Sequence, residues 1–356
     1  MKKTYGTYKG RSTLTDKLRI LALVLLALVV LAAGAVFAAQ DYIVYTEDGP
    51  RLQLPGFFRP EQPADPDPAP LDPGNVSVII EPPETPPEED QTVWLRAAAL
   101  PIKAVTQGTL TAQAEAQGAN AVILDMKTDQ GRLNFVSQQA VAAQVGANSP
   151  LEGINDQLRT AGEGELYLIA RLSCFRDHLT GTEKSYAIET NPGRRWTDLG
   201  GVRWSSPASQ AVRDYLVGLM TELAQLGFDE ILLEYCGYPT AADGHLEYIK
   251  RTPAYPVSGL NEVMAEFFRQ AAQALEEYDV RLSVRTTREA LGGGDRSGQE
   301  AGQLAGLNGH IWMAGDQGGA AALEQAGIQE AEMRLVEMVS AFTPGREVHQ
   351  AVFPQT

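Results

Sequence analysis

Residues 206–235 read SPASQAVRDYLVGLMTELAQLGFDEILLEY, an amphipathic helix followed directly by a short apolar strand. Apolar residues recur in the helical part at steps of three and four, and Gly227 marks its end. Residues 228–235 then form a strand that carries two glutamates among apolar side chains. A helix that leads straight into a buried strand is the repeating unit of a parallel α/β fold.

The same alternation continues on both sides of this stretch. We expect further strands at residues 92–97, 121–125, 166–172, 280–286, 310–313, 334–339 and 347–353, and helices at 109–117, 149–162 and 258–278. This number of units after residue 91 fits an α/β fold of the (β/α)8 TIM-like barrel type, which typically needs about 250 residues. A Rossmann sheet fits less well, because no glycine-rich turn follows the first strand. The short last segment leaves open an incomplete ring.

The chain before residue 91 has a different character. Residues 1–19 hold six basic residues against one acid, and residues 20–39 contain no charged or hydrogen-bonding side chain. A helix of this length spans about 30 Å, one hydrocarbon thickness. The charge order predicts a signal-anchor at the cell membrane, with the basic tip cytoplasmic and the barrel extracytoplasmic. A cleaved signal peptide, which would secrete the body, is the alternative.

Residues 40–90 are expected to form an extended extracytoplasmic linker, and residues 91–356 the barrel. Twelve of the 21 prolines lie between residues 50 and 87, where acidic residues are also frequent. The whole chain has a net charge of -16, which disfavours binding to nucleic acid. Only two cysteines occur, Cys174 and Cys236, and whether they pair stays open.

Function in a barrel gathers at the carboxyl ends of the strands. We predict catalytic roles for Glu234, Asp125 and Glu289, with Asp316 as a further candidate acid. The predicted substrate-binding residues are Lys127, Arg171, Asp177, Trp204, Tyr235 and Trp312. Carboxylates serve as acid, base or nucleophile in glycoside hydrolysis, and aromatic faces stack on sugar rings, so the expected partner is a polysaccharide or oligosaccharide.

Glu234 is the strongest of these candidates, because apolar residues flank it on both sides. Glu230 has the same parity in the strand but lies two pleats earlier, so we expect a buried structural partner there. The four histidines show no metal-ligand spacing, and the loop LGGGD at residues 291–295 is not followed by the Lys-Ser/Thr of a phosphate loop. We therefore predict no metal and no cofactor.

Three blocks of the sequence resemble a bacterial family of glycoside-hydrolase-like domains known as DUF4015. They are NAVILDMKTDQG at residues 120–131, IARLSCFRD at 169–177 and GFDEILLEYCGYP at 227–239. In the family the blocks read roughly V-I-D-x-K-D-D-x-G, A-R-x-x-x-F-K-D and G-F-D-E-I-Q-F-D-Y-x-R-F-P. The resemblance runs from residue 93 to 239 and is faint beyond. It implies a TIM-barrel glycosidase, similar to the α-amylase-like enzymes, that acts on polysaccharide outside the membrane.

The positions that match the family pattern include Asp125, Lys127, Arg171, Asp177 and Tyr235. Four departures fall at the expected active site. Glu234 stands where the family has Asp, Gly237 replaces an Arg, and Arg285 lies near an expected Asp. The residues WMAG at 312–315 stand where the family has Pro-Met-x-Tyr. Two hypotheses therefore stay open: an active glycoside hydrolase, and a carbohydrate-binding or cell-envelope protein that keeps the barrel without its catalysis.

Overall fold

The structure is a computed structural model that describes residues 43–46, 49–52, 93–315 and 318–353. The chain divides into two units, Met1–Thr85 and Pro86–Thr356. The described part of the first unit is a hairpin of two antiparallel strands, β1 (Ile43–Thr46) and β2 (Gly49–Leu52).

The predicted basic tip (1–19) and membrane segment (20–39) lie outside the described residues, as does the linker (40–90) apart from that hairpin. These three assignments stay predictions. In the part of the chain that the structure describes, no helix has the length and apolar character needed to cross a bilayer.

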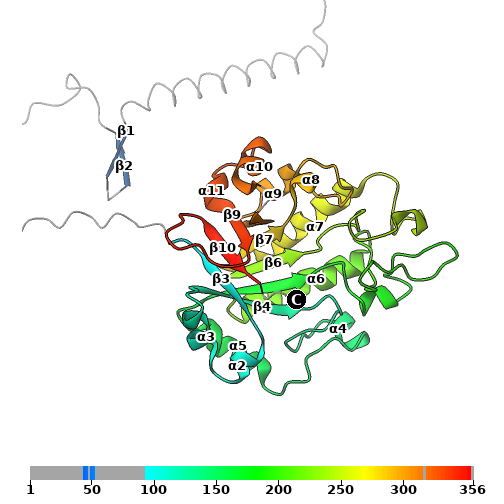
Figure 1. Ribbon diagram of the computed structural model, residues 1–356, viewed down its shortest axis with the longest axis horizontal. Helices are drawn as coiled ribbons and strands as arrows, with labels where there is room; N and C mark the ends of the chain where they lie inside the picture. Colours follow the sequence, from blue (N-terminus) through cyan, green and yellow to red (C-terminus); the bar gives the residue numbers. More distant parts are fainter. Residues whose placement is uncertain (1–42, 47–48, 53–92, 316–317, 354–356) are drawn as a thin grey trace, which may run out of the picture. The chain divides into compact units, whose positions relative to one another are not determined.

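The second unit contains a closed barrel of eight parallel strands, in the order β10-β3-β4-β5-β6-β7-β8-β9 (Figure 1). The strands are β3 (Arg96–Leu100), β4 (Ala121–Lys127), β5 (Tyr167–Ser173), β6 (Glu230–Glu234), β7 (Arg281–Arg285), β8 (Ile311–Ala314), β9 (Leu335–Val339) and β10 (His349–Val352). The predicted (β/α)8 fold is confirmed. The ring is also complete, because β10 pairs with both β9 and β3.

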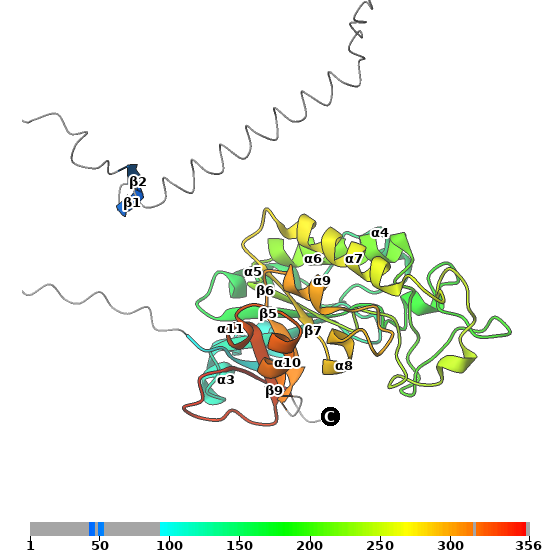
Figure 2. The ribbon, with the colours of Figure 1, turned by 90° about the horizontal axis from the view of Figure 1, so that it is seen from above.

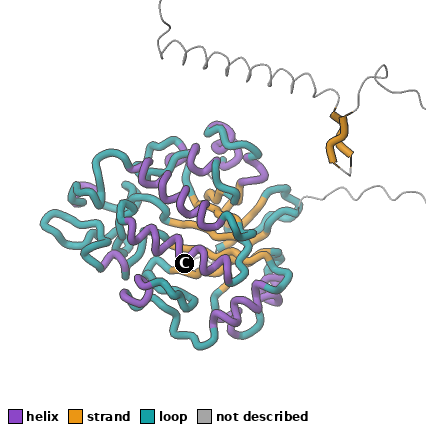
Figure 3. The backbone as a smooth tube through the Cα atoms, turned by 180° about the vertical axis from the view of Figure 1, so that it is seen from behind, coloured by secondary structure: helices purple, strands orange, loops and turns teal. Residues whose placement is uncertain are grey.

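Helices lie between the strands in sequence and cover the outside of the barrel (Figures 2 and 3). They are α2 (Lys103–Thr106), α3 (Leu110–Ala116), α4 (Ala140–Gln144), α5 (Ile154–Gly162), α6 (Gln210–Gln225), α7 (Leu260–Leu275), α8 (Arg288–Leu291), α9 (Ala301–Ala305), α10 (Gly319–Gln325) and α11 (Ala331–Arg334), with 3-10 turns η3 (Thr180–Thr182) and η4 (Leu246–Tyr248). The two longest, α6 and α7, contact each other.

Alternation along each strand divides the apolar side chains between two cores. In β4, Ile123 packs inside the barrel with Leu232 and Trp312, whereas its neighbours Val122 and Leu124 pack outward against the helices. The interior layer accommodates the bulk of Trp312 because β3 and β4 contribute the small side chains Ala97 and Ala121. This alternation fixes which polar residues can point into the barrel.

Two predicted boundaries are wrong. The first strand begins at Arg96 instead of residue 92. It is built from alanines despite their low strand propensity, because Ala97 and Ala99 fit the crowded barrel interior and Ala98 packs in the outer core. Helix α5 begins at Ile154 after the left-handed Gly153, and not at the Ser149-Pro150 pair. Ser149 instead accepts a hydrogen bond from the Leu151 N–H in a short local turn.

The last strand contributes a buried histidine at the amino-terminal end of the barrel. His349 Nδ1 accepts a hydrogen bond from the Leu95 N–H at 2.8 Å, and its ring lies 4.9 Å from that of His310. Desolvation, followed by the proximity of His310, lowers the pKa of His349 to about 4. The Met333 backbone acts in the opposite direction and raises the pKa of His349. The Nε2 atom of His349 has no hydrogen-bond partner among the described residues.

We expect this histidine to make folding sensitive to mild acid. The unfolded chain takes up a proton on His349 near pH 6.5, but the folded chain does so only near pH 4. Stability from this group is therefore complete above about pH 6.5 and falls as the pH drops toward 4, by about 2–3 kcal/mol. Urea midpoints measured from pH 7 to 4 should decline less steeply for His349→Gln; parallel curves for the two proteins would contradict this assignment.

Candidate active site

Strand β6 sends both of its glutamates into the barrel, because Glu230, Leu232 and Glu234 share one parity. Glu230 lies at the amino-terminal end and Glu234 at the carboxyl end, where barrel enzymes carry their chemistry. The neighbouring strand β5 contributes Arg171 and β7 contributes Arg285 at the same end. The structure therefore places these strand-end side chains together.

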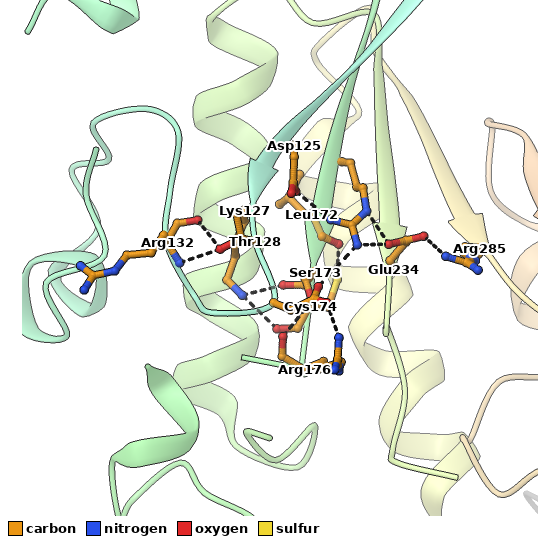
Figure 4. A network of polar contacts seen from close by, with 12 residues as sticks. Asp125, Lys127, Thr128, Arg132, Leu172, Ser173, Cys174, Arg176, Glu234 and Arg285 are labelled. Carbon is orange, nitrogen blue, oxygen red and sulfur yellow. Dashed lines mark hydrogen bonds and ion pairs between the residues drawn. The ribbon is translucent and has the colours of Figure 1, made fainter. Parts of the chain in front are cut away.

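Glu234 is buried, with 1% of its side chain exposed, and two arginines bind it. Arg171 donates from Nε to Oε2, and Arg285 donates from Nη1 to Oε1 (Figure 4). The sequence suggested a carboxylate in apolar surroundings, but both of its oxygens are paired with cations. The reason is that Arg171 and Arg285 also point inward from the strands on either side.

Asp125 binds the same arginine as Glu234. Arg171 Nη1 donates to Asp125 Oδ1 at 2.8 Å, and the two residues are direct neighbours across β4 and β5. Desolvation raises the pKa of Asp125 above its usual value, and the charge of Arg171 opposes that rise. Asp125 Oδ1 and Glu234 Oε2 both accept hydrogen bonds from the Arg171 guanidinium group. These two oxygens are therefore closer together than ~9.5 Å, the upper limit for the two carboxylates of a glycosidase.

The ion-pair network continues away from the barrel axis. Arg171 Nη2 lies 3.4 Å from Asp129 Oδ1, and Asp129 also pairs with Arg176. Arg176 Nε in turn donates to Asp198 Oδ2 at 2.6 Å. Burial acts to raise the pKa of Asp198. Hydrogen bonds from Arg176, the Val202 N–H and the Trp204 indole outweigh this effect and lower the pKa below its usual value. Positive and negative groups thus alternate from Arg285 to the loop that carries Asp198.

A hollow of about 310 Å³ opens beside Glu234. Its lining includes Tyr235, Trp204 and Arg285, together with residues from the loops that follow β6 and β7. The rings of Trp204 and Tyr235 meet edge to face at 5.8 Å, and the Arg176 guanidinium lies 4.9 Å from the Tyr235 ring centre. Trp204 itself is almost fully buried, so only a small part of its surface can face a ligand.

Gly237 stands at the position where the family pattern has an arginine. The structure explains why a residue without a side chain occupies this position. A Cβ atom at this position would lie 2.8 Å from the Ser297 carbonyl oxygen, which also accepts the Tyr238 N–H. The backbone of the 294–299 loop therefore occupies the space of a side chain. The only described arginine that pairs with Glu234 Oε1 is Arg285, from the next strand.

Lys127 and Asp177 are predicted to bind substrate, and the structure places them in an ion pair with each other in the interior. Lys127 Nζ lies 2.8 Å from Asp177 Oδ2, and both side chains are buried at 0% and 2% exposure. Lys127 also donates to the Ser173 and Cys174 carbonyl oxygens. The ion pair connects the end of β4 to the loop after β5, and both of its side chains are buried in the observed conformation.

Trp312, also predicted to bind substrate, lies in the barrel interior. It is fully buried within the barrel, and its indole donates to Glu230 Oε1 at 2.9 Å. Tyr167 Oη donates to Glu230 Oε2 at 3.0 Å, and His310 Nδ1 lies 2.9 Å from the same oxygen. The interpretation of Glu230 as a buried structural partner is therefore correct.

Glu289, a further candidate acid, does not line the hollow beside Glu234. Glu289 is exposed in the first turn of α8 and lines a neighbouring hollow of about 660 Å³. Asp316 lies outside the described residues.

Cys174 and Cys236 are both buried free thiols, and desolvation raises the pKa of Cys174 to about 12.

A more voluminous hollow lies at the opposite end of the barrel. It measures about 1190 Å³, and its lining includes Tyr167, Arg281, His310 and His349. Catalytic residues of TIM barrels nevertheless sit at the carboxyl ends of the strands. We therefore place the candidate site at Glu234, despite the smaller volume there. Within the described ranges no group of three or more His, Cys, Asp or Glu is placed to hold a metal ion.

Sequence reasoning missed the outer members of the network. Asp129 and Arg176 both lie inside the blocks that carry the family resemblance, but neither follows a strand directly. Asp198 lies in a long loop with no strand signal nearby. Arg285 was noted as a departure, but its pairing with Glu234 was not foreseen.

Comparison with known proteins agrees with this geometry. Residues 93–303 match the family DUF4015, described as "Putative glycosyl hydrolase domain". The chain belongs to this family. The DUF4015 match extends well past residue 239, where the resemblance had become faint, and it includes Asp125, Arg171, Glu234 and Arg285. A search of curated proteins found no match.

One solved structure shows the same fold as this DUF4015 chain, and others align with lower scores. The PgaB (BpsB) glycoside hydrolase domain from Bordetella bronchiseptica aligns with a TM-score of 0.50 at 12% identity, over 74% of this chain and 94% of that domain. A hypothetical protein from Ruminiclostridium thermocellum aligns at 22% identity with a TM-score of 0.45, over 52% and 96%. An alpha-L-fucosidase from Paenibacillus thiaminolyticus gives 11% identity and 0.47, over 74% and 46%. At these identities the likeness extends to the fold alone.

Proposed function

We propose that the protein is a glycoside hydrolase that cleaves a polysaccharide at the carboxyl end of its barrel. The observation that carries this proposal is the attachment of Asp125 and Glu234 to the same guanidinium group, that of Arg171. Paired carboxylates within about 9.5 Å are the minimum equipment for glycoside hydrolysis. Family membership supports the same reaction class.

The two carboxylates have environments suited to different tasks. Asp125 is partly exposed and its pKa is raised by desolvation, which favours the protonated form that a general acid needs. Glu234 accepts hydrogen bonds from two guanidinium groups, which suits a carboxylate that faces the positive charge developing on the sugar. In this scheme Asp125 protonates the glycosidic oxygen, and Arg171 holds both carboxylates in place.

A specific observation also favours the second hypothesis, a carbohydrate-binding protein without hydrolysis. Arg171 lies between the two carboxylates, and Arg285 takes the remaining oxygen of Glu234. A scissile bond would need space between acid and nucleophile. If these ion pairs persist when sugar binds, the site can recognise a polysaccharide but not cleave it.

The proposed location rests on the sequence. The uncharged segment 20–39, with basic residues before it and an acidic body after it, would anchor the protein in the cell membrane with the barrel outside. The proline-rich linker would then hold the barrel away from the bilayer. Protease protection of the barrel in intact cells, compared with cells made permeable, would test this orientation.

The proposed function is tested by incubating the full-length protein with a panel of polysaccharides and measuring new reducing ends. Glycol chitin, chitosan, xylan and a β-1,3-glucan cover neutral and amino sugars. Release from one of them supports hydrolysis. Retention in gels that contain one of these polymers, without any release, supports the binding protein. Neither release nor retention on any polymer would contradict both hypotheses.

We expect the rate of hydrolysis to fall on the alkaline side as Asp125 loses its proton. A general acid works only when protonated, so activity is highest below its pKa and declines as the pH rises through that value. Because the pKa of Asp125 is raised, the decline should begin above the range of an ordinary aspartate. Asp125→Asn should lower kcat by about 10²–10³-fold and remove this limb of the profile. An unchanged profile in the variant would assign the acid to another residue.

A further inference from the structure

Two hollows near Glu234 adjoin each other. The hollow of about 310 Å³ beside Glu234 and the hollow of about 660 Å³ next to it share part of their lining, including Thr240 and Asp295. The second hollow extends to Leu246, the first residue of η4. Together their linings extend from Glu234 to Leu246.

The rim at η4 carries exposed rings. Tyr248 is 60% exposed, and its ring lies 5.5 Å from that of His245, which is also exposed. Leu199, 72% exposed, approaches the backbone at Gly244, and its N–H donates to the Asp243 carbonyl. We name Leu199, His245 and Tyr248 the rim platform.

The rim platform is held firmly from below. The Trp196 indole donates to the His245 carbonyl oxygen at 3.3 Å, and the Asn191 N–H donates to the Tyr248 carbonyl oxygen at 3.3 Å. Trp196 is almost fully buried and packs edge to face on Trp204, which lines the hollow beside Glu234. Large apolar side chains are thus kept at the surface by a rigid base, which is typical of binding sites.

The chemistry of the path favours one kind of occupant. The second hollow is lined by two acids, Glu289 and Asp295, and by two bases, Arg288 and Arg296. Balanced charge gives no net attraction for a strongly charged polymer, but carboxylates and guanidinium groups both form strong hydrogen bonds with hydroxyls. Ring faces at the end of the path can pack on the apolar face of a sugar.

We infer that the two hollows and the rim platform form one extended groove for a polysaccharide chain, with a sugar unit on Tyr248 remote from Glu234. This inference rests on the proposed function, and it deepens it by assigning an internal stretch of polymer, rather than a short sugar, as the ligand. It also gives Glu289 a different task from the one predicted: a hydroxyl-binding residue of the middle of the groove.

The test compares polymer and short ligands on the full-length protein. Tyr248→Ala should weaken retention by the polymer that the unmodified protein binds, by about 10-fold in affinity gels. Tyr248→Phe, which keeps the ring, should stay within about twofold. Glu289→Gln should weaken polymer binding by about 5-fold. Met333→Ala, an exposed apolar side chain at the other end of the barrel, is the matched control and should change nothing.

Short ligands separate the groove from the site at Glu234. A disaccharide of the same linkage, too short to span both places, should bind equally to the unmodified protein and to Tyr248→Ala. Loss of polymer binding in Tyr248→Ala with unchanged disaccharide binding supports the groove. Equal polymer binding by all variants overturns the groove but leaves the proposed function standing. No polymer binding by the unmodified protein overturns both.

Discussion

Asp177→Asn is expected to destabilise the barrel by about 3–5 kcal/mol. The reason is that Lys127, the partner of Asp177, is fully buried. The Lys127 ammonium group lies 2.8 Å from Asp177 Oδ2. Asparagine would leave a buried cation without a counter-charge and could turn an amide N–H₂ toward it. For a domain of this size the expected fall in melting temperature is about 10 °C.

Thermal and urea unfolding of the full-length protein would measure this effect. The matched control is Asp156→Asn, which removes the carboxylate of an ion pair of similar length on the surface, with Arg159. That pair is highly exposed, so its loss should cost under about 1 kcal/mol. Replacing both buried partners, in Lys127→Met with Asp177→Leu, should recover most of the stability. Equal losses for Asp177→Asn and Asp156→Asn would contradict a structural role for the buried pair.

Glu234→Gln is expected to reduce kcat by about 10³-fold or more if the protein hydrolyses a polysaccharide. The amide keeps the shape of the side chain but removes the negative charge next to the developing positive charge of the sugar. Arg171 and Arg285 would then face a neutral group, which adds to the electrostatic loss. Reducing-end release measures the change, and affinity gels show whether the polysaccharide still binds.

Two further variants sharpen this prediction. Glu234→Asp restores the residue type of the family but draws the carboxylate back by one methylene, so we expect an intermediate loss of about 10²-fold. Glu337→Gln is the control, since Glu337 also lies on a barrel strand and pairs with an arginine, Arg346, at 2.6 Å. It should leave kcat within about threefold. Hydrolysis that survives Glu234→Gln unchanged would place the chemistry elsewhere.

The barrel could be predicted from sequence because short apolar strands recur along the chain and several of them follow a helix with clear periodicity, as β6 follows α6 and β7 follows α7. Glu230 and Glu234 share one parity in β6, and the position of Glu230 two pleats earlier in the strand distinguishes this buried structural residue from the candidate Glu234. The first strand could not be placed correctly, because its alanines suit a crowded interior and not the usual strand composition.

The site was predictable only as a set of strand ends. Asp125, Arg171 and Glu234 follow from that rule, and the structure brings them together. The burial of Lys127 does not follow, because the pairing of β4 with β5 shifts register between residues 125 and 127. Such a bulge redirects side chains locally and leaves no reliable trace in residue type. Long-range partners such as Arg176 depend on loop conformations that periodicity does not describe.

The closure of the ring by β10 has a consequence for how the protein is made. The strand is only four residues long, yet it alone joins the open edges of β3 and β9, which lie far apart in the sequence. A chain that leaves the ribosome from its amino end can build the earlier β/α units but cannot complete the ring until residue 352 has emerged. Until then two unpaired strand edges are exposed to neighbouring chains. A chain that ends before residue 349 would keep both edges unpaired, so we expect it to aggregate.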